Sequence, residues 1–301
     1  MSDDGPTGTQ AEMPAVVDIA VASQLLGENV HVLAIAPNTH RPTRRWVWLL
    51  HGHGVEPAEI RNLLAQIVRA ISDGQLPPHI VVAPLAPWMD GGSWWVDSAY
   101  AGDATVDTES GRPIESVMLT EVLPQLEAAW GTPDRDDRVV AGISMGGAAA
   151  LRWALVHRAL FSSGVLLSPS VYAAGPHHAS SARSTGAFGV GHNLWDAERY
   201  RTLVSYPDLL AARPIEGQHT KIVTVVGDGE VAMDQGGPIT LEKNGPIAAV
   251  GERRDLDLEA ARLHSALKER PDIQSALRVV AGGHNWDLWR REIVSALRLA
   301  G

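Results

Sequence analysis

Short hydrophobic runs alternate along the chain with longer segments in which hydrophobic residues recur every three or four positions. The runs predict β-strands, and the longer segments predict amphipathic helices. An antiparallel pair is expected first, at 16–22 and 29–36, followed by strands at 46–50, 79–85, 138–141, 164–167, 221–226 and 276–280. Helices are expected at 57–72, 115–130 (interrupted by Pro124), 146–157, 256–270 and 286–299. This order predicts an α/β fold with a mostly parallel central sheet flanked by helices.

Two stretches interrupt this alternation. Residues 168–217 are rich in Ser, Gly, His and Ala with little periodicity, and they predict a cap-like insertion over the end of the sheet. A second long loop is expected at 227–251. Residues 1–15 are polar and predict a flexible tail, so that 16–301 would form a single domain.

Composition narrows the classes of function. A net charge of −10 argues against a nucleic-acid partner and suits small neutral or cationic substrates. The absence of cysteine excludes disulfides, thiolate catalysis and cysteine-based zinc sites. No hydrophobic run reaches the ~18 residues that a membrane span needs, and no secretory signal is recognisable at the N-terminus. We therefore expect a cytoplasmic protein without a membrane span, and we leave its oligomeric state open.

The most informative motif is Gly-x-Ser-x-Gly, at Gly142 to Gly146 with Ser144 in the middle. A β-branched strand ends directly at the motif, and a helix rich in small residues begins directly after it. This context is typical of a nucleophile elbow, in which a strained turn projects the serine hydroxyl. The nearby helix N-terminus favours negative charge that develops there. We predict that Ser144 is a nucleophile.

The chain also offers a base and an oxyanion hole. His284 lies between the last strand and the last helix, after two glycines, where this chain order places the base. The loop after the strand 46–50 carries His51 and His53. We expect the amides of His53 and Met145 to hold an oxyanion. The rival interpretation, a metal pair of His51 and His53, lacks a third ligand at recognisable spacing.

The third member of a triad is a buried acid that orients the histidine. Asp228 and Glu230 follow the strand 221–226, Asp234 lies further along the same loop, and Glu252 precedes the helix 256–270. The residues alone do not rank these four.

Four motifs in order resemble the esterase D and antigen 85 family of α/β-hydrolases. They are Leu49-Leu50-His51-Gly52, Gly91-Gly92-Ser93-Trp94-Trp95-Val96-Asp97, Gly142-Ile143-Ser144-Met145-Gly146-Gly147, and Gly283-His284-Asn285-Trp286 with Trp289. The resemblance covers roughly residues 30 to 299. It implies the α/β-hydrolase fold and favours Glu252 as the acid, because the antigen 85 type uses a Glu after a long loop, and Glu252 precedes His284 by 32 residues.

The resemblance implies serine-dependent hydrolysis of a small-molecule carboxylic ester through an acyl-enzyme, with no cofactor and no metal. An acyltransferase using an alcohol acceptor, and a non-catalytic binding member of the fold, are the alternatives. The substrate pocket is expected near the motifs and in the insertion, at His51, Trp94, Trp95, Asp97, Trp195 and Trp286, with Tyr200 and Tyr206.

Overall fold

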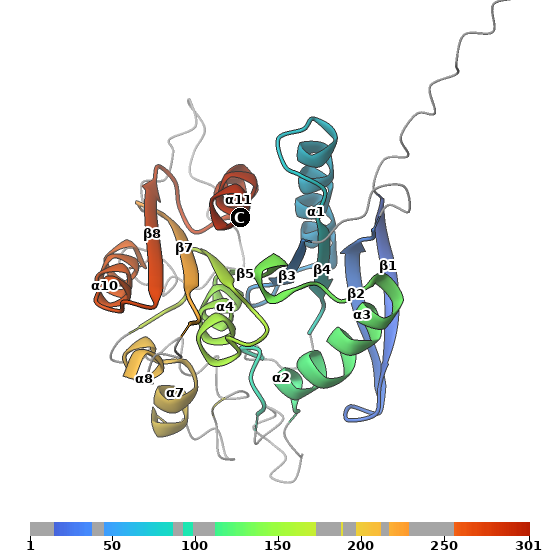
Figure 1. Ribbon diagram of the computed structural model, residues 1–301, viewed down its shortest axis with the longest axis horizontal. Coiled ribbons are helices and arrows are strands. Elements are labelled where there is room, and N and C mark those ends of the chain that lie inside the picture. The colour runs from blue at the N-terminus through green and yellow to red at the C-terminus, as the bar shows by residue number, and fades with distance from the viewer. Residues whose placement is uncertain are drawn as a thin grey trace, which may run out of the picture.

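The sheet and its helices are seen in a computed structural model of the protein (Figure 1). The structure describes residues 15–37, 45–86, 93–98, 112–172, 188, 197–211, 217–228 and 256–301. Within these ranges the element order alternates between strands and helices, as the hydrophobic pattern predicts. The α/β fold with a mostly parallel sheet is therefore confirmed.

Eight strands form the sheet, in the order β1-β2-β4-β3-β5-β6-β7-β8. The pairs β1–β2 and β2–β4 are antiparallel, and all other neighbouring strands of this sheet are parallel. The strands are β1 (Val16–Ser23), β2 (Glu28–Ile35), β3 (Trp46–Leu50), β4 (Ile80–Pro84), β5 (Arg138–Ile143), β6 (Ser163–Leu167), β7 (Thr220–Gly227) and β8 (Ile273–Val280). Because β3 and β5 are central, they are buried on both faces, which explains the unbroken hydrophobic run of β3 and the apolar residues that follow Arg138 in β5.

Two hydrophobic cores lie on opposite faces of the sheet. On one face, side chains of β3 and β5 pack against α1 (Pro57–Ser72) and α11 (Trp286–Ala300). On the other face the sheet packs against α2 (Ile114–Val117), α3 (Leu123–Trp130), α4 (Met145–Val156) and α10 (Leu256–Lys268). Figure 1 shows α1 and α11 together on one side of the sheet, away from α4. Alternation along β3 divides its residues between the cores, since Trp48 faces α4 and Leu49 faces α1.

The predicted interruption near Pro124 takes a specific form. A π-helical segment, Met118–Val122, joins α2 to α3, and Pro124 lies at the start of α3. Proline lacks the N–H that an α-helix requires, and a wider turn accommodates this loss. The predicted helix therefore exists, but with altered hydrogen bonding in its middle.

The stretch 168–217 contains regular structure that the sequence analysis missed. Helices α7 (Ala197–Val204) and α8 (Tyr206–Ala211) both pack against α4 (Figure 1). Each is at most eight residues long, too short for a clear helical period. Much of this stretch, the tail 1–14 and the loop 229–255 lie outside the described residues. The division into tail, single domain and cap-like insertion therefore stays a prediction.

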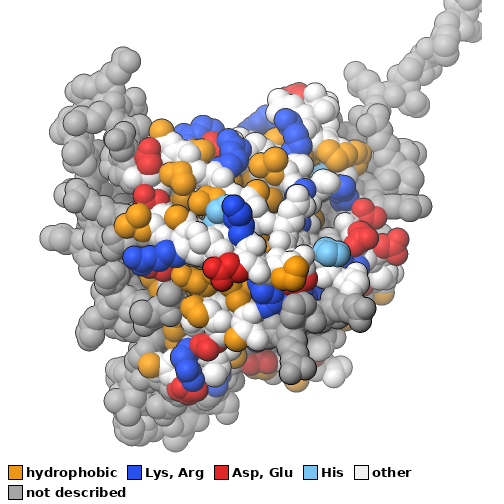
Figure 2. All heavy atoms as spheres, turned by 60° about the vertical axis from the view of Figure 1, so that its left-hand side comes forward, with side chains coloured by type: hydrophobic (Ala, Val, Ile, Leu, Met, Phe, Trp, Pro, Cys, Tyr) orange, Lys and Arg blue, Asp and Glu red, His pale blue; other side chains and the backbone are white. Residues whose placement is uncertain are grey.

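The surface carries both signs of charge. On the face in Figure 2, basic and acidic side chains are interspersed with hydrophobic ones. Leu258 of α10 and Val279 of β8 are among the exposed hydrophobic residues. Within the described ranges, no helix is both long enough and apolar enough to span a bilayer. The cellular location stays a prediction from the sequence.

Candidate active site

Ser144 sits on a strained turn between β5 and α4. Its backbone angles are φ 56° and ψ −116°, a left-handed φ that side chains rarely adopt. The strain is held in place because Ser144 N donates to Leu167 O of β6 at 2.9 Å and Ser144 O accepts from Ala148 N at 3.1 Å. The side chain is partly exposed, whereas the residues on both sides of it are buried. The turn thus presents the hydroxyl at the carboxyl end of the sheet.

The glycines of the motif are required by close backbone contacts. A Cβ on Gly142 would lie 1.9 Å from Gly146 O, and one on Gly146 would lie 2.0 Å from Leu50 O. A Cβ on Gly147 would meet Pro169 Cα at 2.9 Å. Any side chain at these positions would push α4 away from the ends of β3 and β6. The motif therefore works by letting three backbone segments meet behind Ser144.

His284 reaches Ser144 from the other end of the chain. The Ser144 hydroxyl lies 2.9 Å from His284 Nε2, the distance of a good hydrogen bond. Asn285 begins α11 as its N-cap, accepting from Leu288 N through its side chain, and so fixes the helix directly after His284. The predicted nucleophile and base, 140 residues apart, are brought together. This pairing lets His284 take the proton of Ser144 during attack.

A tryptophan supports the imidazole of His284. The rings of Trp289 and His284 meet edge-on, with centroids 5.0 Å apart and planes at 89°. Trp289 is itself held by its Nε1–H, which donates to Ser168 Oγ at 3.1 Å, and by an edge contact with Trp286. Trp286, which packs on the same Trp289, remains partly exposed. These contacts restrict the orientation of the base.

The loop after β3 lies against the elbow. A Cβ on Gly52 would be 3.2 Å from both Ile143 O and Ser144 Cβ, so this backbone runs next to the nucleophile. Met145 is the first residue of α4, and its N–H has no acceptor within the helix. Both backbone segments that the sequence analysis chose for the oxyanion hole therefore adjoin Ser144. The side chain of His53 is exposed.

The family model described as "Putative esterase" matches residues 23–300. The chain belongs to this esterase family. The family expected from the four motifs is thereby confirmed.

Individual relatives of this esterase-family chain share 30% or less of its sequence over the matched residues. Esterase MT1326 of Mycobacterium tuberculosis (strain CDC 1551 / Oshkosh) is 30% identical over 146 residues, which are 46% of this chain but only 28% of that relative. Among solved structures, M. tuberculosis MPT51 (FbpC1) has a TM-score of 0.63 at 15% identity, covering 95% of this chain and 98% of its own. An S-formylglutathione hydrolase from Agrobacterium tumefaciens has a TM-score of 0.60 at 18% identity, covering 97% and 96%. At these identities the structural matches establish the shared fold.

His51 supports the loop of this esterase-family site from within. It is buried, its Nδ1–H donates to Gly52 O at 2.7 Å, and its Nε2 accepts from Ala86 N at 3.0 Å. Burial lowers the pKa of His51 to about 4, and the hydrogen bond to Gly52 offsets only part of this effect. The ring is therefore neutral near pH 7, and both nitrogens are used by the backbone. These contacts are structural and leave neither nitrogen for a substrate or metal.

Trp94 and Trp95 are likewise buried in the core. Trp95 donates from Nε1 to His51 O at 3.1 Å, and Trp94 packs edge-on against Phe188 and Tyr200. Both tryptophans have positive φ, 50° and 56°, as do Ser144 and Ser168. Strained backbone among the described non-glycine residues is thus confined to segments around the elbow. Trp94 connects this region to α7, which carries Tyr200.

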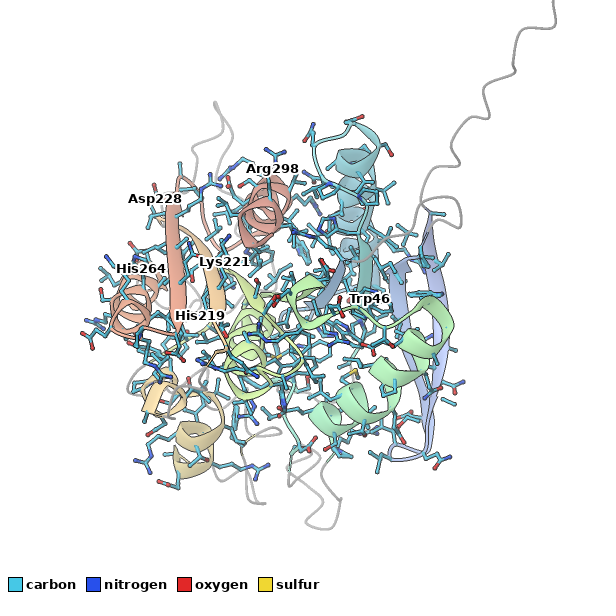
Figure 3. The ribbon with its side chains drawn as sticks, in the orientation of Figure 1. Trp46, His219, Lys221, Asp228, His264 and Arg298 are labelled. Atoms are coloured by element: carbon cyan, nitrogen blue, oxygen red, sulfur yellow. The ribbon has the colours of Figure 1, made fainter. Side chains whose placement is uncertain are left out.

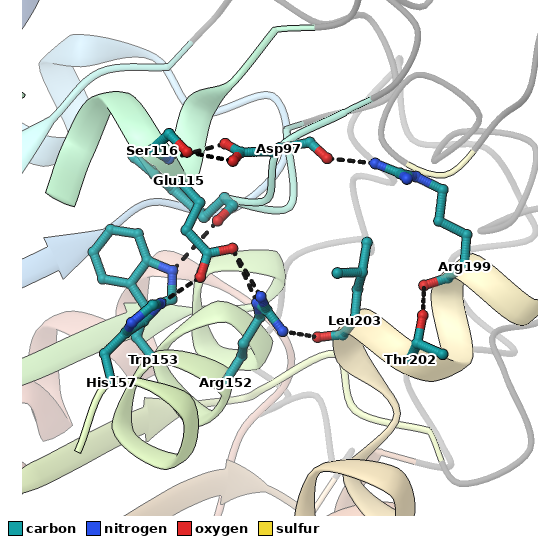
Figure 4. Close-up of polar contacts among 10 residues, drawn as sticks. Asp97, Glu115, Ser116, Arg152, Trp153, His157, Arg199, Thr202 and Leu203 are labelled. Atoms are coloured by element: carbon teal, nitrogen blue, oxygen red, sulfur yellow. Dashed lines mark hydrogen bonds and ion pairs between the residues drawn. The ribbon is translucent and has the colours of Figure 1, made fainter. Parts of the chain in front are cut away.

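Asp97 belongs to a polar network next to the site (Figure 4). Its carboxylate accepts from Ser116 N at 2.9 Å and from the Ser116 hydroxyl, and its backbone O accepts from Arg199. In the same network, Glu115 accepts from Arg152 at 3.0 Å and lies 2.6 Å from His157 Nε2 (Figure 4). The described contacts of Asp97 therefore join α2 to α7. Tyr206 of α8 is also buried.

Of the four candidate acids, only Asp228 lies among the described residues. It follows β7 directly, at the opposite end of that strand from His219 and Lys221 (Figure 3). Its Oδ1 accepts from Gly282 N at 3.2 Å, in the loop that leads to His284, but the residue is exposed. A triad acid is buried, so these facts favour a loop-holding role for Asp228. Glu230, Asp234, Glu252 and the pocket candidate Trp195 lie outside the described residues.

One hydroxyl at the site was not anticipated. Ser170 Oγ lies 3.2 Å from Ser144 Oγ, and Ser170 N donates to Ser144 O at 3.0 Å. The strand order carries the signal, because β6 pairs with β5 and the carboxyl ends of parallel neighbours lie together. This strand order places any residue directly after β6 near the nucleophile, which is the signal that could have identified Ser170.

Proposed function

We propose that the protein hydrolyses carboxylic esters of small molecules through an acyl-enzyme on Ser144. The observation that carries this proposal is the 2.9 Å contact between Ser144 Oγ and His284 Nε2 on a strained elbow. Membership of an esterase family supports the same reaction. The matching family and the curated relative, both called esterases, favour hydrolysis over acyl transfer to an alcohol. The intact pairing of Ser144 with His284 argues against a non-catalytic role.

The steps follow from the geometry. Ser144 Oγ attacks the acyl carbon while its proton moves to His284 Nε2, and the carbonyl oxygen becomes an oxyanion. We propose that the backbone amides of Met145 and His53 hold that oxyanion. His284 then gives its proton to the departing alcohol, leaving the acyl group on Ser144. Water repeats the sequence, releasing the acid and restoring the Ser144 hydroxyl.

For the remaining roles we propose Glu252 as the acid that orients His284, with Glu230, Asp234 and Asp228 as the alternatives. The exposure of Asp228 supports placing it last. We propose that Trp286, which is partly exposed and packs on the same Trp289 as His284, lines the substrate pocket together with Trp195. Replacing each acid by its amide separates the candidates. Replacing the true acid should lower kcat by about 10³- to 10⁴-fold, as in other triads. Replacing any of the others should lower kcat much less.

The test of the proposed function is covalent labelling with a fluorophosphonate, followed by intact mass, together with turnover of p-nitrophenyl acetate. We expect one adduct on the wild type, none on Ser144→Ala and slow labelling of His284→Ala. Turnover should fall by at least about 10³-fold in both variants. Ser265→Ala is the matched control, because its hydroxyl donates to Ala261 O on an exposed helix surface. A folded wild type with neither adduct nor turnover would refute the proposal.

A further inference from the structure

Ser170 places a second hydroxyl against the nucleophile. Its Oγ lies 3.2 Å from Ser144 Oγ, and the residue is partly exposed, as Ser144 is. Its backbone is fixed to the nucleophile, because Ser170 N donates to Ser144 O at 3.0 Å. Pro169, just before it, packs against Gly147 of the elbow. The two hydroxyls are therefore parts of one rigid unit.

Hydrogen-bond valence decides the direction of the contact. A serine hydroxyl has one hydrogen and two lone pairs. In the reactive arrangement the Ser144 hydrogen points to His284 Nε2, so the contact between hydroxyls requires Ser170 to be the donor. Once Ser144 is acylated, its Oγ is an ester oxygen without hydrogen and can only accept. Ser170 is the donor in both states.

We propose that Ser170 is a catalytic residue whose hydroxyl stabilises negative charge on Ser144 Oγ as the acyl-enzyme forms and breaks down. The inference rests on the proposed ester hydrolysis. In acylation, charge develops on Oγ when its proton moves to His284 and its bond to the acyl carbon forms. In deacylation, that bond breaks, Oγ takes the electron pair, and His284 returns the proton. Ser170 donates to Oγ throughout and keeps its own proton.

This role differs from that of an oxyanion hole. Backbone amides at the elbow would act on the carbonyl oxygen of the substrate, whereas Ser170 acts on the oxygen of the enzyme itself. The resting distance of 3.2 Å is longer than the 2.5–3.0 Å that is usual between oxygens. Hydrogen bonds to charged oxygens are shorter and stronger. The contact therefore gains strength as charge accumulates, which is the condition for lowering a barrier.

The neighbouring serine cannot take this role. Ser168 Oγ accepts from Trp289 Nε1 at 3.1 Å and is buried beneath the indole. Ser168 therefore supports the tryptophan that packs on His284, and Ser170 contacts the nucleophile. In the segment Ser168-Pro169-Ser170, the first hydroxyl therefore supports the base through Trp289, and the second contacts the nucleophile directly.

The experiment compares the wild type, Ser170→Ala, Ser170→Thr and the control Ser265→Ala by stopped-flow burst kinetics with p-nitrophenyl acetate. We expect Ser170→Ala to slow both acylation and deacylation by about tenfold, the worth of one hydrogen bond to a charged oxygen. Ser170→Thr keeps a hydroxyl and should recover to within about threefold of the wild type. Fluorophosphonate labelling of Ser170→Ala should slow by a similar factor, without a matching fall in thermal stability.

The outcomes separate this inference from the proposed function. If the wild type is active and Ser170→Ala has the same rate constants, only the role of Ser170 is overturned. A loss in Ser170→Thr as large as that in Ser170→Ala would also overturn it, because the hydroxyl would then not be the cause. A wild type that neither turns over nor is labelled would instead overturn the ester hydrolysis itself.

Discussion

The buried imidazole of His51 makes stability depend on pH in a defined window. In the folded protein its pKa is about 4, against 6.5 for an ordinary histidine. Between these values the unfolded chain binds a proton that the folded chain does not, so the free energy of unfolding falls as the pH drops from 6.5 toward 4. For these two pKa values, the contribution lost between pH 7.5 and pH 4.5 is about 2–3 kcal/mol.

The substitution His51→Gln removes this titration. A glutamine amide oxygen can accept from Ala86 N as Nε2 does, and it does not protonate. Urea unfolding followed by tryptophan fluorescence gives the free energy of each protein at both pH values. We expect the wild type to lose about 2–3 kcal/mol more than the variant on acidification. Equal losses, within about 0.5 kcal/mol, would refute a neutral buried His51, whatever the variant's stability at pH 7.5.

Two further predictions concern the elbow and a buried ion pair. In Gly146→Ala the new Cβ would meet Leu50 O at 2.0 Å, so we expect a lower melting temperature and loss of esterase turnover. The control Gly283→Ala, whose Cβ would be 3.4 Å from Asn285 Nδ2, should melt near the wild type. Equal melting temperatures for the two variants would contradict the steric argument. For Asp272, burial raises the pKa, but hydrogen bonds from Arg270 and Arg158 outweigh this and lower it to about 2. Asp272→Asn should therefore lower the free energy of unfolding in urea by about 3–5 kcal/mol at pH 7. The difference from the wild type should shrink as the pH falls from about 4 to 2, because a protonated Asp272 no longer gains from the charges of Arg270 and Arg158. A difference that stays constant across this range would show that the carboxylate charge is not the cause.

The parts of the fold and site that follow from local sequence were predictable. The elbow needs only a strand, two glycines around Ser144 and a helix, all within one short segment. The place of His284 between β8 and α11 predicts it as the base, because chain order in this fold fixes which loop carries the base. In both cases the backbone places the residue, and distant side chains such as Ser168, acting through Trp289, only adjust the orientation of the imidazole.

Contacts between distant residues were not predictable in this way. Trp95 was a candidate pocket residue, yet its indole donates to the backbone of His51, 44 positions earlier. A tryptophan in a loop has the same local pattern whether it faces substrate or core. Ser170 shows the converse, since nothing in its local sequence marks it and only the pairing of β6 with β5 brings it to Ser144. The choice of Glu252 over Glu230 rests on the family resemblance for a similar reason, because the acid is defined by its contact with the base and not by its local sequence.

The edge contact between Trp289 and His284 gives the protein a built-in optical probe. Trp289 is buried and held by Ser168, so that its distance to the imidazole varies little. We expect the emission of an indole in such close contact to depend on the charge of the imidazole. If His284 takes and returns the proton as proposed, each transfer should change the emission of this indole. Replacing Trp289 alone among the ten tryptophans would identify its signal, and the charge on the base could then be followed in real time without any added label.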